Sequence, residues 1–95
     1  MYATIRRYAS ARGLVDALVD NEGEVRDLLR GIDGFHAYYM LRTSEGGAIS
    51  VSVYEDASGA DASNVAAAGW VRENLPELAA AGPPETTAGE VAVSF

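Results

Sequence analysis

Residues 48–55, with the sequence AISVSVYE, alternate between apolar and polar side chains. The two faces of an extended chain would carry Ile49, Val51 and Val53 on one side and Ser50, Ser52 and Tyr54 on the other. Residues 35–42 form a second, aromatic stretch with strand character, and a turn cluster over 43–47 ends in two glycines. The pattern therefore predicts two strands joined as an antiparallel hairpin.

The rest of the chain contributes two more strands and two helices to the prediction. A strand is expected over 2–8, and apolar residues at helical spacing predict a helix from about 11 to about 30, with Ser10 as a candidate N-cap. Asn21-Glu22-Gly23 predicts a bend or break in this helix. After a polar loop over 56–61, a second helix is expected over 62–75, with one more turn beyond Pro76 over 77–79. A last strand is expected over 89–95.

This order, β-α-β-β-α-β, predicts an α+β fold of the ferredoxin-like type. The expected architecture is a four-stranded antiparallel sheet with two helices on one face. The 95 residues, with a mass of 10.0 kDa, correspond to a single domain spanning 1–95.

The more apolar face of the sheet is expected to lie beneath the helices. That face would consist of Phe35, Ala37, Tyr39, Leu41, Ile49, Val51, Val53, Val91, Val93 and Phe95. The other face would hold Thr4, Arg6, Tyr8, His36, Tyr38, Met40, Ser50, Ser52 and Tyr54. A second copy of the chain is the simplest cover for this polar and aromatic face, and would close two sheets into an eight-stranded barrel.

Net charge and composition restrict the kinds of partner and site that this chain is expected to have. The formal net charge is −7, which makes nucleic acid and membrane surfaces poor partners. The chain has no cysteine and one histidine, so neither disulfides nor a metal cluster is expected. No apolar stretch has the length of a membrane span or resembles a signal peptide, which predicts a cytoplasmic protein.

Candidate site residues can each be interpreted in two ways. His36 is the one side chain whose unperturbed pKa lies near neutrality. It could act as a general base on a phenolic substrate, or form a hydrogen bond at an interface or strand end. Arg6 or Arg7 could hold a substrate oxygen, the other forming an ion pair. The remaining candidates are Tyr8, Tyr38, Tyr54 and Trp70, which suit either an aromatic ligand or ordinary packing, and Asn74, which shares a helix face with Trp70.

Several segments carry a resemblance to a known family. They are YATIRRY at 2–8, Gly34-Phe35, SVSVYED at 50–56, AAGWV at 67–71 and GEV at 89–91. Over essentially its whole length the chain resembles the dimeric α/β-barrel superfamily, specifically the antibiotic-biosynthesis-monooxygenase-like proteins. The resemblance implies a homodimer with one pocket per subunit between sheet and helices.

Members of that family include cofactor-free oxygenases of polyketide aromatics, quinol-oxidising enzymes and heme-degrading enzymes. The heme-degrading members present a histidine from the second helix region, where this chain has none, so neither heme nor another cofactor is expected. Trp70 and Asn74 lie in the region where the family places pocket residues.

Two functions from different classes remain open at this point. The first is a cofactor-independent monooxygenase that binds a phenol or hydroquinone. His36 would serve as the base or its helper, and Arg6, Tyr38 and Tyr54 would stabilise the oxyanion. Tyr8, Trp70 and Asn74 would contact the ligand. The second is a non-catalytic dimeric module that binds a ligand or serves as a structural partner.

Overall fold

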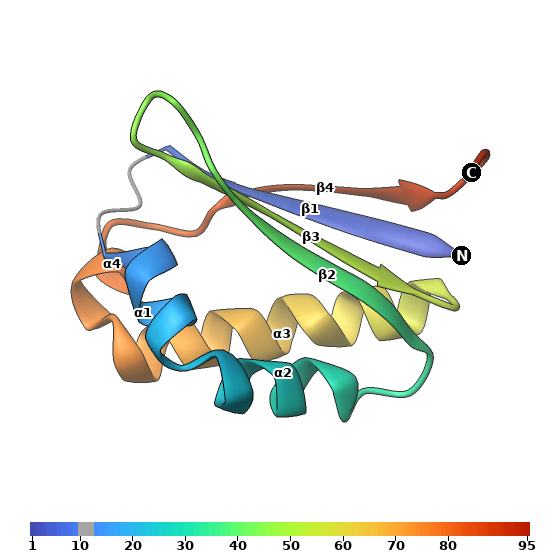
Figure 1. Ribbon diagram of the computed structural model, residues 1–95, viewed down its shortest axis with the longest axis horizontal. Coiled ribbons are helices and arrows are strands. Elements are labelled where there is room, and N and C mark those ends of the chain that lie inside the picture. Colours follow the sequence, from blue (N-terminus) through green and yellow to red (C-terminus); the bar gives the residue numbers. More distant parts are fainter. Residues whose placement is uncertain (10–12) are drawn as a thin grey trace.

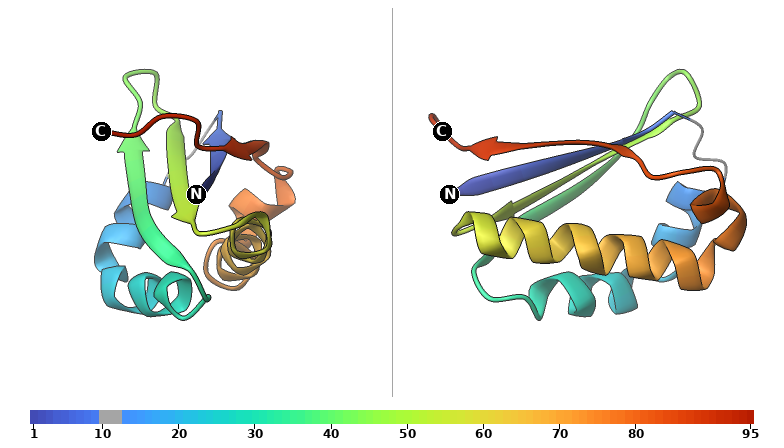
Figure 2. Two further views of the ribbon diagram at one scale, coloured as in Figure 1. Left: turned by 90° about the vertical axis from the view of Figure 1, so that its right-hand side faces the viewer. Right: turned by 180° about the vertical axis from the view of Figure 1, so that it is seen from behind.

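The computed structural model describes residues 1–9 and 13–95. Along the chain the elements are β1 (Tyr2–Tyr8), α1 (Leu14–Asp20), α2 (Glu22–Arg30), β2 (Phe35–Arg42), β3 (Ala48–Tyr54), α3 (Ala57–Asn74), α4 (Pro76–Ala80) and β4 (Glu85–Glu90). The four strands form one antiparallel sheet in the order β2-β3-β1-β4, and the helices lie on one side of it (Figures 1 and 2). The predicted α+β, ferredoxin-like architecture is confirmed.

The first predicted helix is broken where the sequence indicated. Asn21 separates α1 from α2 and has non-helical backbone angles. Its side-chain amide donates to the Ala17 carbonyl at 2.8 Å, and its backbone N–H donates to the same oxygen at 3.0 Å, so Asn21 closes the end of α1 with two hydrogen bonds. The predicted start of this helix at residue 11 and the predicted cap at Ser10 lie outside the described residues.

The second predicted helix begins five residues earlier than expected, at Ala57. The prediction of a polar loop over 56–61 is wrong, because Asp56 caps the helix. Its carboxylate accepts from the Gly59 amide at 3.1 Å and from the Ser58 hydroxyl at 2.7 Å, which the run of small residues after it permits. Pro76 then ends α3 and occupies the first position of α4, as its missing N–H favours. None of the described helices is long and apolar enough to cross a membrane.

The last strand lies earlier in the chain than predicted. β4 covers Glu85–Glu90 and not 89–95, because Tyr2 of β1 already pairs with Glu90. Beyond that point β1 has only Met1 left, whose carbonyl accepts from the Val91 amide at 2.9 Å. Val93 and Phe95 consequently lie exposed, not beneath the helices as the alternation suggested.

The two faces of the sheet are reversed relative to the prediction. The helices cover the polar and aromatic face, which includes the buried residues Thr4, Arg6, Tyr8, Ala48, Ser50, Ser52 and Tyr54. On the opposite face Ile5, Tyr39 and Leu41 are 39%, 61% and 50% exposed. Alternation separates two faces but does not state which one receives the helices. Here α3 itself presents polar side chains to the sheet, so the polar strand residues are satisfied when buried.

A β-bulge explains why strand β2 departs from simple alternation. Phe35 pairs with Tyr54, and Ala37 pairs with the preceding residue Val53, so His36 is the extra residue. As a result Phe35 and Tyr38 lie on the same, helix-covered face. The ring of Phe35 meets the ring of Tyr54 edge to face at 5.6 Å.

Substitution by alanine at Gly59 and at Gly69 of α3 is expected to change the free energy of unfolding in opposite directions. A Cβ on Gly59 would lie 2.9 Å from Cδ2 of Tyr54 and 3.1 Å from the carbonyl of Asp33, whereas a Cβ on Gly69 would meet only Arg72, at 3.7 Å. We expect Gly59→Ala to lower the free energy of unfolding by about 1–3 kcal/mol. Gly69→Ala should raise it by up to about 1 kcal/mol through helix propensity. Urea unfolding of both variants measures the difference, and equal effects would contradict the close packing of α3 on Tyr54.

Because the Tyr54 phenol is buried, we expect the free energy of unfolding to fall at alkaline pH. Its hydroxyl is buried and donates to the Leu29 carbonyl at 2.7 Å, and burial raises its pKa above 10.0. Stability from the neutral phenol is therefore complete below the unfolded pKa of about 10 and falls as pH rises through the folded pKa. Urea unfolding between about pH 8 and about pH 11 should show a steeper decline for the wild type than for Tyr54→Phe. Tyr39→Phe, on the exposed face, should keep the wild-type slope.

Candidate ligand-binding pocket

A small internal cavity lies between the polar face of the sheet and the helices. Its volume is about 20 Å³, enough for roughly one water molecule. The cavity is lined by Arg6, Tyr8, Tyr38, Met40 and Ser50 from the sheet and by Leu14, Leu18, Val25, Leu28, Leu29, Ala67, Trp70 and Val71 from the helices. Polar groups on the sheet side and apolar groups on the helix side give it the two-sided chemistry of a ligand site.

The guanidinium of Arg6 is held by four neutral side chains. Nε donates to the hydroxyl of Ser50 at 2.9 Å, and Nη2 donates to that of Ser52 at 2.7 Å. Nη1 donates to the amide oxygen of Asn64 at 2.6 Å and to the hydroxyl of Ser63 at 3.5 Å. Partners on strand β3 and on helix α3 thus fix the planar group from both sides.

The positive charge of Arg6 has no carboxylate beside it. Arg6 is only 2% exposed, and the ion pairs found within residues 1–9 and 13–95, His36–Glu55 and Arg42–Asp16, do not include it. An arginine keeps its charge at any physiological pH, and a buried charge without a counter-charge is costly. The cavity is therefore a place where an anion, or an oxygen that becomes anionic, would be stabilised.

Tyr8 and Tyr38 line the same cavity as neutral phenols. Burial raises the pKa of both hydroxyls, and the nearby charge of Arg6 lowers it in part. Each phenol therefore keeps its proton near neutral pH and can donate a hydrogen bond to an oxygen in the cavity.

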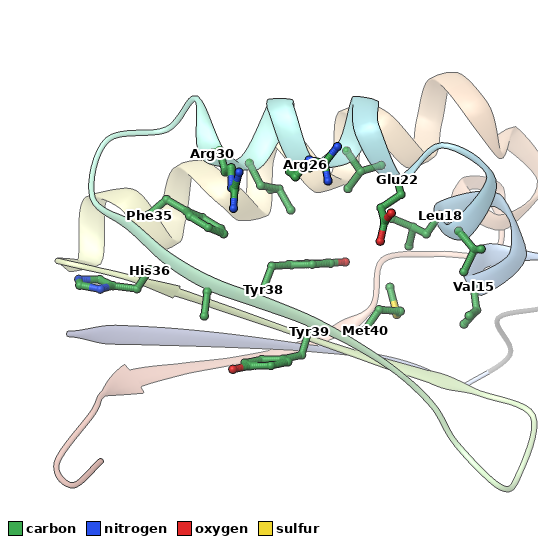
Figure 3. Close-up of a pocket in the computed structure, with 14 residues that line it drawn as sticks. Val15, Leu18, Glu22, Arg26, Arg30, Phe35, His36, Tyr38, Tyr39 and Met40 are labelled. Atoms are coloured by element: carbon green, nitrogen blue, oxygen red, sulfur yellow. The ribbon is translucent and has the colours of Figure 1, made fainter. Parts of the chain in front are cut away.

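A larger groove lies next to this cavity. It has a volume of about 500 Å³ and lies between the helix pair α1–α2 and the edge strand β2 (Figure 3). The residues that line both spaces are Leu18, Val25, Leu29, Tyr38 and Met40. The groove and the inner cavity are therefore neighbours on either side of these five side chains.

Charged side chains border the groove along one stripe of α2. Glu22, Arg26 and Arg30 are spaced four residues apart and line the groove on its helix side, across from Tyr38 (Figure 3). Below them Phe35 and Met40 complete an apolar floor. The groove therefore combines an aromatic and apolar interior with a charged margin.

His36 lies at the β2 end of the groove, and its side chain is directed away from Tyr38 (Figure 3). Its Nε2 is 2.6 Å from Oε2 of Glu55, and the two side chains are 41% and 67% exposed. This hydrogen bond with His36 lowers the pKa of Glu55. Because an ionised carboxylate only accepts, Nε2 carries the hydrogen, which leaves Nδ1 of a neutral His36 as an acceptor.

The structure brings together only part of the predicted set. Arg6, Tyr8, Tyr38 and Trp70 share the inner cavity. Trp70 also donates from Nε1 to Glu24 at 3.2 Å. Tyr54 and Asn74 line neither space; their polar groups contact the Leu29 and Trp70 carbonyls at 2.7 and 2.9 Å.

Sequence reasoning missed the residues that hold Arg6 and those that border the groove. Ser63 and Asn64 were assigned to no site, although two adjacent polar residues inside an alanine-rich helix were a signal for a buried polar contact. The predicted apolar position Val65, next to them, is 75% exposed. In the described part of the chain, no group of three or more side chains is arranged to hold a metal ion.

No protein-family model and no curated protein matches the chain, whereas solved structures do. One similar structure is the monooxygenase ActVA-Orf6 of Streptomyces coelicolor with nanaomycin D bound (TM-score 0.70, 14% identity, 99% of this chain and 89% of that chain covered). A second is SnoaB, a cofactor-independent oxygenase from Streptomyces nogalater (TM-score 0.63, 15% identity, 99% and 95% covered). A third is a dimeric ferredoxin-like protein from an uncultured marine organism (TM-score 0.67, 15% identity, 99% and 95% covered). The chain has the fold of the antibiotic-biosynthesis-monooxygenase-like proteins.

Proposed function

We propose that residues 1–95 form one unit that binds a small phenol or hydroquinone in the pocket between sheet and helices. The aromatic ring would occupy the groove above Phe35 and Met40, whose size suits a small molecule. One hydroxyl oxygen would enter the inner cavity, which has room for a group of about that size. The uncompensated charge of Arg6 is the observation that carries this proposal.

The proposed chemistry is oxidation of the bound phenol by dioxygen without a cofactor. Arg6 stabilises the phenolate oxygen, and the neutral hydroxyls of Tyr8 and Tyr38 donate to it. The electron-rich anion then reduces dioxygen. Conversion of a phenol to a para-quinone balances with one dioxygen: one atom becomes the new carbonyl oxygen and the other leaves as water. A hydroquinone already carries both oxygens, so its oxidation to the quinone passes two electrons and two protons to dioxygen, which leaves as hydrogen peroxide.

The other predicted residues have more peripheral roles in this proposal. His36 lies at the outer end of the groove, away from the hydroxyl in the inner cavity, so its Nδ1 would accept the proton of a second, outer hydroxyl of a hydroquinone. Trp70 forms part of the cavity wall. Tyr54 and Asn74 act on the ligand only through the packing of α2 and α3. These assignments extend the sequence-based predictions for these residues.

Substitution of neighbouring tyrosines on β2 tests the site. Tyr38→Phe removes a hydroxyl inside the pocket. Tyr39 also borders the groove, but its side chain is directed to the opposite side of β2, so Tyr39→Phe removes a hydroxyl that does not point into the pocket (Figure 3). With a panel of hydroquinones, we expect oxygen uptake by the wild type. We also expect kcat/KM to fall about fivefold or more in Tyr38→Phe, since one hydrogen bond to a charged oxygen is lost. Tyr39→Phe should match the wild type.

The same assay separates the enzyme from a non-catalytic module. His36→Ala should lower the rate of oxygen uptake, and an unchanged rate would remove His36 from the mechanism. Binding of hydroquinones without oxygen uptake would favour the binding module. Absence of both binding and uptake would overturn the proposed function.

We also propose that a second copy of the chain covers the open face of the sheet. Ile5, Tyr39 and Leu41 leave large apolar surfaces exposed there, and the helices occupy the other face. An exposed apolar sheet face of this kind is typical of an interface. The similar ferredoxin-like protein from an uncultured marine organism is dimeric. The partner surface is thus the apolar face, and not the polar face that the sequence favoured.

Two valines provide a matched test of this dimer. Val51 lies on the open face of β3, and Val65 lies exposed on α3. We expect Val51→Lys to convert the protein to a monomer in analytical ultracentrifugation, because a buried lysine charge opposes association. Val65→Lys should leave the dimer intact. A monomeric wild type would contradict the proposed interface.

A further inference from the structure

Three arginines of this chain line the cavity and the groove, although the chain as a whole is acidic. All seven basic residues are arginines, and the formal net charge is −7. Yet Arg6 lines the cavity, and Arg26 and Arg30 line the adjacent groove, where Glu22 is the one acidic residue among the lining side chains of these two spaces. The pocket is therefore the cationic part of an acidic protein, which favours an anionic ligand.

Arg26 and Arg30 form a second cationic position, separate from Arg6. Arg6 is buried at the inner end, beneath the sheet-facing side of α3, whereas the two α2 arginines are exposed along the outer groove (Figure 3). Within the described residues, neither takes part in an ion pair, unlike Arg42, which pairs with Asp16 at 3.2 Å. Both guanidinium groups are thus available to a ligand lying in the groove.

We propose that the ligand is a hydroxylated aromatic acid with two anionic ends. The hydroxyl oxygen enters the inner cavity at Arg6, and a carboxylate on the opposite part of the molecule lies between Arg26 and Arg30. This inference rests on the proposed function, since it assumes that a phenol or hydroquinone ring occupies the groove. It adds the substrate class: an aromatic carboxylate and not a neutral phenol.

The two positions make different contributions to recognition. The inner cavity has a volume of about 20 Å³, which suits a single oxygen better than a two-oxygen carboxylate. The open groove has about 500 Å³ and a guanidinium pair, whose planar donors match the two oxygens of a carboxylate. This difference in size sets the orientation of the ligand.

Three related probes test the inference by calorimetry under anaerobic conditions, where binding is measured without turnover. They are hydroquinone, homogentisate (hydroquinone with a carboxymethyl group) and the methyl ester of homogentisate. We expect homogentisate to bind about fivefold to tenfold more tightly than its ester at low salt, because the groove arginines are solvent-exposed and screened. The ratio should fall to about twofold or less in the double variant Arg26→Gln/Arg30→Gln.

Arg72→Gln is the matched control, since Arg72 is exposed on α3 and lines neither space. It should keep the wild-type ratio of acid to ester, and thermal unfolding should confirm that all variants fold. Equal affinity for acid and ester, with hydroquinone still bound, would overturn this inference and leave the proposed function standing. A preference that survives the double variant would also overturn it, because Arg6 would then hold the carboxylate. If no probe binds, both proposals fail.

Discussion

Burial of the Arg6 charge is the constraint on which the rest of the structure depends. The guanidinium cannot lose its proton, so every group around it has to supply hydrogen-bond acceptors. Ser50 and Ser52 do so from the neighbouring strand, and Ser63 and Asn64 do so from α3. The position of α3 over the sheet is thus determined by polar contacts as much as by apolar packing.

The same arrangement accounts for the division of the interior into two parts. On the α3 side the polar side chains are satisfied among themselves, and Thr4 joins them by donating to Asn64 at 3.0 Å. On the side of α1 and α2 the helices contribute Leu14, Val25 and Leu29 to an apolar cluster. The cavity lies where these two environments meet, with charge and phenol hydroxyls on one wall and aliphatic side chains on the other.

This arrangement links stability to function. A buried cation held by neutral partners costs free energy of folding, since nothing in the described part of the chain neutralises it. An anionic oxygen in the cavity would recover part of that cost on binding, which makes the site selective for ligands able to carry negative charge. The wall of neutral tyrosines adds donors without adding charge, because burial keeps their pKa high.

Local pattern determined the element types and their order. The alternation over 48–54, the break at Asn21 and the stop at Pro76 are consequences of backbone geometry and were predictable. The register of β4 was not, because it depends on where β1 begins to pair with Glu90. Nor was the early start of α3, where the side-chain cap at Asp56 begins the helix although Ser58 and Gly59 lie in its first turn.

For the candidate site, too, the sequence predicted one part and only the tertiary structure decided the rest. From side-chain type, the sequence predicted Arg6, Tyr8, Tyr38 and Trp70 as candidate ligand contacts, but it predicted His36, Tyr54 and Asn74 on the same grounds. Only the tertiary structure decided that Arg6, Tyr8 and Tyr38 lie on the helix-covered face of the sheet. It also decided that Tyr54 and Asn74 line neither space and that Arg26 and Arg30 border the groove. The physical reason is that the backbone geometry of a strand is the same on both of its faces, so alternation alone does not say which face becomes buried. The choice between them is made by the partner surface, here the polar side of α3, which lies far away in the chain.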